Sequence, residues 1–174
     1  ARLSTDLSIP SRYLVLMPYG HHTGVSQRIE AEEERDRLRS IIEHIQTEHK
    51  LPGSVIVRTA AEGIPEADIA QDMAYLAKLW EFIQRKQKVI AVPSLIFEEL
   101  PLPQRVIRDL ANADTTKISV DSREIHAKLQ EFVQEFVPSM ESRLIHYPGE
   151  RPIFDLYNVE EDIQRALQTR VALK

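Results

Sequence analysis

The stretch VIVRTAAEG, residues 55–63, places a basic and a hydroxyl-bearing residue directly after three apolar positions. Residues 55–57 are β-branched, which is typical of a buried strand. Arg58 and Thr59 follow at its end, and small or flexible residues come next. A guanidinium can bind two phosphate oxygens, while a hydroxyl and free backbone amides can donate to a third. The stretch therefore predicts a strand whose end suits a terminal phosphate.

The residues alone leave a second interpretation open. In this interpretation Arg58 pairs with a nearby carboxylate and Thr59 only ends the strand, because charged residues after buried strands are usually solvated.

Apolar periodicity on both sides of this stretch predicts strands alternating with helices. Residues 31–49 have one apolar stripe and an acidic opening, which favours an amphipathic helix. Strands are predicted at 13–17, 55–57, 118–120 and 143–147, and helices at 31–49, from Pro65 onward, at 103–111, up to Phe136 and at 159–168. The weakest region of this pattern, residues 111–117, separates two predicted parts. The pattern indicates an α/β fold.

Asp121 follows a predicted strand, where a metal-binding carboxylate can lie. Glu124 stands three residues later and completes the spacing of a capping box. We therefore expect Asp121 to cap the helix that ends at Phe136, and not to bind a metal.

Composition argues against several classes of protein. The chain has no cysteine, so it forms no disulfide and carries no thiolate nucleophile. A net charge of −5 argues against binding nucleic acid by bulk charge, so a site for a polyanion would be local. No glycine-rich nucleotide motif is present, and the histidines lack metal-ligand spacing. No segment has the length and apolar character of a membrane span.

Several strings, taken in order, resemble the ribonuclease E/G family, and within it the ribonuclease G branch. They are YLVLMP (13–18), GVSQRI (24–29), IVRTAAEG (56–63), QRVIRD (104–109) and PIFDL (152–156). The resemblance runs from Arg2 to Lys174. Because the chain opens at Ala1 inside a β-like segment, we expect it to be a piece of a longer protein.

The resemblance implies an α/β (α+β) fold in three parts. Residues 1–18 would be the C-terminal end of an OB-fold RNA-binding domain with its exit strand. Residues 19–113 would form a small mixed α/β 5′-sensor domain. Residues 114–174 would be the C-terminal segment of an incomplete RNase H-like α/β subdomain, whose open edge predicts association.

The resemblance also implies that the sensor binds the 5′-monophosphate of single-stranded RNA through Arg58 and Thr59. Val15 falls where the family places a valine against the terminal nucleotide. Ser11 falls close to the phosphate, where its backbone would make any contact, and Arg28 falls where a basic residue lies near the pocket. A triphosphate is too bulky and charged for a small donor-lined pocket, and a 5′-hydroxyl leaves its donors unpaired.

The implied parent protein is a cytoplasmic, homo-oligomeric endoribonuclease that acts in RNA processing, including rRNA processing, and in decay. It would hydrolyse phosphodiesters with a Mg²⁺-bound hydroxide, and its metal ligands would lie beyond Lys174. We therefore expect no catalytic or metal-binding residue in this chain, and no cleavage by the chain alone. The alternative is a structural module that couples domains or protomers without sensing 5′ ends.

Overall fold

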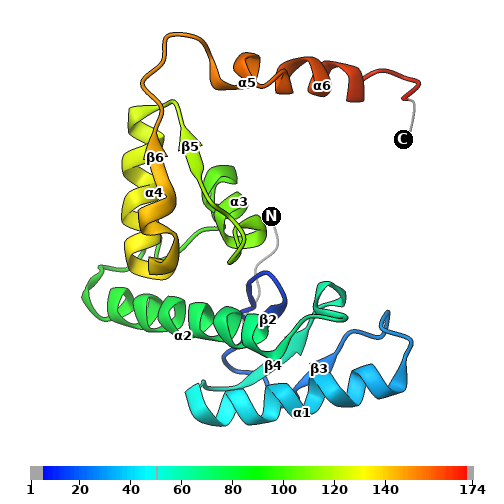
Figure 1. The fold of residues 1–174 in the computed structure, drawn as a ribbon. Coiled ribbons are helices and arrows are strands. Elements are labelled where there is room, and N and C mark those ends of the chain that lie inside the picture. The colour runs from blue at the N-terminus through cyan, green and yellow to red at the C-terminus, as the bar shows by residue number, and fades with distance from the viewer. Residues whose placement is uncertain (1–5, 50, 172–174) are drawn as a thin grey trace. The chain divides into compact units, whose positions relative to one another are not determined.

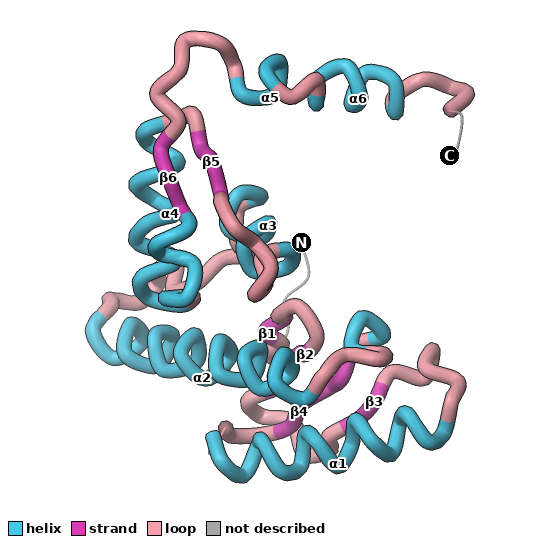
Figure 2. Tube along the Cα trace, viewed as in Figure 1, coloured by secondary structure: helices cyan, strands magenta, loops and turns pink. Residues whose placement is uncertain are grey.

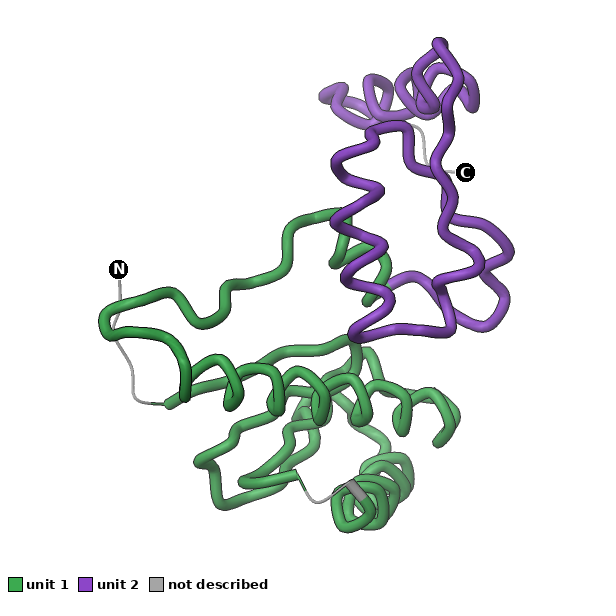
Figure 3. Tube along the Cα trace, turned by 90° about the vertical axis from the view of Figure 1, so that its left-hand side faces the viewer, with its two compact units in different colours: residues 1–109 green, residues 110–174 purple. Residues whose placement is uncertain are grey.

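The computed structural model of the protein describes residues 6–49 and 51–171. The chain divides into two compact units, residues 1–109 and residues 110–174, coloured separately in Figure 3. Each unit combines strands with helices, which confirms the α/β fold class. The division lies just before the region 111–117, and the assignment of the three predicted parts to named domains stays a prediction. None of the helices within the described ranges is long and apolar enough to cross a membrane.

The first unit contains a mixed four-stranded sheet in the order β1-β2-β4-β3. Strand β2 is antiparallel to both β1 and β4, and β3 is parallel to β4. The elements are β1 (Ile9–Pro10), β2 (Leu14–Met17), β3 (Gly24–Val25), α1 (Glu32–His49), β4 (Ser54–Val57), the 3-10 helix η1 (Thr59–Ala61), α2 (Glu66–Val89) and α3 (Leu102–Leu110). The sequence predicted β2, β4, α1 and α3 to within one residue at each end, and the start of α2 to within one residue. It missed β1 and β3, which are too short to show a periodicity.

Helices α1 and α2 cover the same face of this sheet (Figures 1 and 2). Helix α2 packs against β2 and α1 packs against β3, and the two helices also pack against each other. Leu14 and Val57 are directly opposed across β2 and β4 and are fully buried under the helices. Val15 and its partner Ile56 alternate to the other face, where Ile56 is 37 % exposed. One face of the sheet therefore remains open in this part of the unit.

Glu34 of α1 ties the turn after η1 to the helix. Its carboxylate accepts two hydrogen bonds of 2.7 Å from the Arg37 guanidinium and one of 2.9 Å from the Gly63 amide. Arg37 also donates to the Ile64 carbonyl at 3.1 Å. The hydrogen bonds from Arg37 and Gly63 lower the pKa of Glu34 to about 2. The segment that follows Arg58 is thus fixed by a charged contact with α1.

The second unit is built on a parallel pair of strands, β5 (Ile118–Val120) and β6 (Leu144–His146), against which α4 (Arg123–Phe136) packs. The 3-10 helix η2 (Pro138–Arg143) connects α4 to β6. Leu129, Phe132 and Val133 of α4 are buried. Helices α5 (Ile153–Leu156) and α6 (Val159–Ala166) follow one after the other and contain no buried residue.

The predicted cap of α4 is wrong by one residue. Ser122 occupies the N-cap position, and its hydroxyl accepts a 3.2 Å hydrogen bond from the Ile125 amide. Glu124 does not complete a capping box, because its carboxylate accepts a 2.6 Å hydrogen bond from the Lys128 ammonium. Asp121 precedes the cap and is exposed.

Replacing Glu34 tests the contact between α1 and the turn. We expect Glu34→Gln to lower the free energy of unfolding by about 1 kcal/mol at pH 7, because it weakens charge-assisted hydrogen bonds in a partly exposed site. The folded pKa lies below the ordinary value, so this contribution is present above about pH 4.5 and is lost as the pH falls towards 2. Urea unfolding at several pH values measures it.

Glu33→Gln is the matched control, since Glu33 is exposed and occupies the same first turn of α1. Equal losses in the two variants at pH 7 would contradict the assignment, because both remove one negative charge from the helix N-terminus.

Candidate anion-binding site

Arg58 extends the sheet beyond the last residue of β4. Its backbone is extended, and its amide donates a 2.8 Å hydrogen bond to the Tyr13 carbonyl. The guanidinium Nη1 donates to the carbonyls of Ser11, at 2.6 Å, and Arg12, at 3.2 Å. Nε and Nη2 have no hydrogen-bond partner among the described residues, and the side chain is exposed. One edge of the guanidinium is therefore anchored while the other remains available to a ligand.

The residues directly after Arg58 carry further donors. The Thr59 hydroxyl lies 3.0 Å from the Ser26 hydroxyl, which follows β3. The Ser26 amide donates to the Val57 carbonyl, so β3 continues alongside β4 as far as this point. The amides of Thr59 and Ala60 donate to no acceptor within the described parts of the chain. The two residues that follow Arg58 thus carry a hydroxyl and two unpaired amides.

Asp72 of α2 fixes the loop between β1 and β2, residues 11–13, to which Arg58 is hydrogen-bonded. Its carboxylate accepts hydrogen bonds from the Ser11 hydroxyl at 2.6 Å and from the amides of Arg12, Tyr13 and Leu14 at 3.2, 2.8 and 3.1 Å. Asp72 is only 8 % exposed. Burial raises the pKa of Asp72, and these hydrogen bonds oppose the increase.

Arg108 of α3 contacts the same loop one residue earlier. Its side chain is 6 % exposed, and its guanidinium donates to the Pro10 carbonyl at 3.3 Å. The guanidinium also forms two hydrogen bonds with Asp109, at 2.7 and 3.0 Å, which lower the pKa of Asp109. The carbonyls of Pro10, Ser11 and Arg12 are therefore all paired with arginines.

The predicted site residues fall into two groups. Arg58 and Thr59 are consecutive at the end of β4, and Val15 lies on the open sheet face, paired with Ile56 two residues before Arg58. Ser11 is fully buried with its hydroxyl on Asp72, so only its carbonyl meets Arg58. Arg28 is exposed in the turn after β3, and its side chain makes no hydrogen bond or ion pair with the described residues.

The sequence did not predict the roles of Asp72, Ser26 and Arg108. Asp72 had a usable signal, because a carboxylate three residues after Ile69 and four before Leu76 lies on the apolar face of α2. No pattern around Ser26 or Arg108 pointed to either role.

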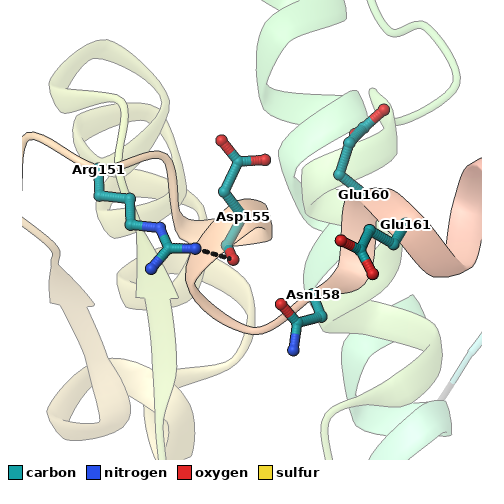
Figure 4. A pocket seen from close by; sticks show the side chains of 5 residues that line it. All are labelled: Arg151, Asp155, Asn158, Glu160 and Glu161. Carbon is teal, nitrogen blue, oxygen red and sulfur yellow. Dashed lines mark hydrogen bonds between the residues drawn. The ribbon is translucent and has the colours of Figure 1, made fainter.

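A separate hollow of about 210 Å³ lies in the second unit, next to α5 and α6 (Figure 4). Arg151, Asp155, Asn158, Glu160 and Glu161 line it. The Arg151 guanidinium donates a 3.0 Å hydrogen bond to the Asp155 carbonyl, drawn as a dashed line. The described residues contain no group of three or more acidic or histidine side chains placed to hold a metal ion, here or elsewhere.

The fold and its unpaired donors define an α/β protein with a candidate anion-binding site at the end of a strand. The chain belongs to the Ribonuclease E/G family, whose model matches residues 8–174.

Individual relatives agree with this membership. The chain is 49 % identical to Ribonuclease G of Escherichia coli (strain K12) over 174 residues, which cover all of this chain and 35 % of that protein. It is 44 % identical to Ribonuclease G of Haemophilus influenzae, with the same coverage. Identity to Ribonuclease E of Synechocystis sp. is 36 % over 178 residues, covering 99 % of this chain and 26 % of that protein.

These values confirm the predicted similarity to the ribonuclease G branch. The chain spans about a third of the length of the ribonuclease G relatives.

Removing the Asp72 carboxylate tests whether it holds the loop between β1 and β2 in place. We expect Asp72→Ala to lower the free energy of unfolding by about 3 kcal/mol, because it leaves buried backbone amides without an acceptor. Urea unfolding measures this loss. Glu81→Ala, at an exposed position of the same helix, is the control and should change stability by less than about 0.5 kcal/mol. Similar small effects in both variants would refute the assignment.

Proposed function

We propose that this chain binds the 5′-monophosphate of single-stranded RNA at Arg58 and Thr59, as part of an endoribonuclease that acts in RNA processing and decay. The observation that carries the proposal is that only one edge of the Arg58 guanidinium is hydrogen-bonded within the described part of the protein. Its Nη1 is held by two carbonyls, while Nε and Nη2 have no partner within the described residues. An arginine held in this way presents a preorganised fork to an anion.

The size of the donor set favours a terminal monophosphate. Two guanidinium nitrogens, the Thr59 hydroxyl and the amides of Thr59 and Ala60 match the oxygens of one phosphate group. A 5′-hydroxyl gives these donors no charged partner, and a triphosphate adds negative charge that this small set does not neutralise. Ser11 would contribute through its carbonyl contact with Arg58, and Arg28 would add a basic side chain near the RNA.

Cleavage would take place outside this chain. The relatives are named Ribonuclease G and Ribonuclease E, and this chain covers 35 % of the two ribonuclease G proteins described above and 26 % of the ribonuclease E protein. We propose that the parent protein is a cytoplasmic homo-oligomer that hydrolyses RNA phosphodiesters with Mg²⁺. The described residues include no cluster suited to that ion, so its ligands would come from another part of the parent.

A structural role for Arg58 is the second candidate, because Nη1 ties the loop before β2 to the end of β4. The postulated ion pair is absent from the described residues, where Arg58 bonds to carbonyls instead. In this case the chain would couple parts of the parent protein without sensing 5′ ends.

Binding of RNAs that differ only at the 5′ end separates the two candidates. We expect the chain to prefer a 5′-monophosphate over a 5′-triphosphate or 5′-hydroxyl, and Arg58→Gln to remove about 2 kcal/mol of that preference, because charge-assisted hydrogen bonds are lost. Fluorescence anisotropy with short single-stranded RNAs measures the three affinities.

Arg39→Gln is the matched control, since Arg39 is exposed on α1 and pairs only with Asp36. A preference that survives Arg58→Gln, together with a lower unfolding temperature of that variant, would favour the structural role and overturn the sensor.

A nuclease assay tests where cleavage occurs. We expect no cleavage of single-stranded RNA by this chain in the presence of Mg²⁺, since no described cluster of side chains can hold the ion. Cleavage that copurifies with the chain and is abolished by EDTA would contradict this expectation.

A further inference from the structure

The hydroxyl of Thr59 has one partner among the described residues, the hydroxyl of Ser26 at 3.0 Å. Ser26 directly follows β3, and Thr59 is the first residue of η1. Because β3 runs parallel to β4, with Val25 opposite Val57, the two strands end at the same edge of the sheet. Two hydroxyls that are 33 residues apart in the sequence therefore meet beside the end of β4.

The backbone of Ser26 is held on both sides. Its amide donates a 2.9 Å hydrogen bond to the Val57 carbonyl, and its carbonyl accepts one of 3.1 Å from the amide of Ile29, which is fully buried. The Ser26 hydroxyl also accepts a longer hydrogen bond, of 3.4 Å, from the Arg28 amide, a local contact typical of turns that begin with serine. These contacts keep the hydroxyl of half-buried Ser26 beside the exposed Thr59.

The direction of the hydrogen bond between Ser26 and Thr59 decides which proton is left for a ligand. Each hydroxyl carries a single proton, so only one of the two donates. If Thr59 donates to Ser26, the Thr59 proton is used within the protein, and Thr59 can present only an oxygen lone pair, which repels an anion. If Ser26 donates, the Thr59 proton is free for the ligand. The described residues offer the Ser26 proton no acceptor other than Thr59, which favours the second direction.

We propose that Ser26 is a positioning residue for the 5′-monophosphate, whose hydroxyl donates to the Thr59 oxygen and thereby directs the Thr59 proton to the phosphate. This inference rests on the proposed function, because that function places the phosphate within reach of Thr59. An ionised phosphate accepts hydrogen bonds, so it selects this direction. Successive hydrogen bonds polarise one another, and the bond from Thr59 to the phosphate is strengthened. Ser26 thus acts through Thr59 and not by contact with the RNA.

A double-mutant cycle of Ser26→Ala and Thr59→Val tests this dependence, with the preference for 5′-monophosphorylated over 5′-hydroxyl RNA as its readout. We expect Thr59→Val to lower the preference about tenfold, because it removes the direct donor, and Ser26→Ala to lower it about threefold. The double variant should match Thr59→Val, since Ser26 has no separate route to the phosphate. Fluorescence anisotropy measures the affinities, and those for the 5′-hydroxyl RNA should stay unchanged.

Further variants separate this role from a general effect on the fold. Ser26→Thr keeps a hydroxyl at this position and should restore the preference. Ser40→Ala, which removes an exposed serine hydroxyl from α1, is the matched control and should leave the preference unchanged. Thermal unfolding checks that each variant is folded. If Ser26→Ala does not fold, Ser26→Cys takes its place in the cycle, because a thiol is a weak donor of similar size.

A full preference in Ser26→Ala would overturn this inference, as would a Ser26→Thr variant as impaired as Ser26→Ala. A double variant whose loss equals the product of the two single losses would also overturn it, because Ser26 would then act independently of Thr59. None of these results affects the proposed function. That function fails separately if the unsubstituted chain does not prefer the 5′-monophosphate, or if Arg58→Gln retains the preference.

Discussion

The buried carboxylate of Asp72 is the contact on which the rest of the candidate site depends. It lies on α2, and it accepts hydrogen bonds from residues 58 to 61 positions earlier in the chain, at the entrance to β2. A buried charge is tolerated only when hydrogen bonds replace its lost water, and here one hydroxyl and three amides do so. With its amides turned towards Asp72, the loop holds the carbonyls of Ser11 and Arg12 against Arg58.

Charged contacts also fix the segments on either side of the site. Arg108 holds the Pro10 carbonyl before the loop, and Glu34 holds the Gly63 amide after η1. The short stretch from β4 to η1 thus runs between two anchored segments. Preorganisation of this kind reduces the entropy lost when a ligand binds, so a small donor set can discriminate between related anions. The proposed sensor depends on this rigidity.

The sequence was sufficient for the long, periodic elements, and the site at the end of β4 stays a prediction. Helices α1 and α2 have apolar stripes, and the end of β4 presents a cation where an anion could bind. The cap of α4 was misplaced because Asp121 and Ser122 are both good capping residues, and only the backbone decides which of them is used. The role of Asp72 could not be predicted in detail, because its partners are distant in sequence and their approach is a property of the tertiary fold.

The anchoring of Arg58 on main-chain carbonyls has an evolutionary consequence. Every amino acid supplies a carbonyl, so position 12 can change identity over time without losing the acceptor that it offers to the guanidinium. Position 11 is more restricted, because its hydroxyl also donates to Asp72. Asp72 cannot be substituted as freely, since its carboxylate is a side-chain group that few residues can replace. Among descendants of a common ancestor, we therefore expect sequence drift at position 12 and constancy at positions 11 and 72, although all three serve the same arginine.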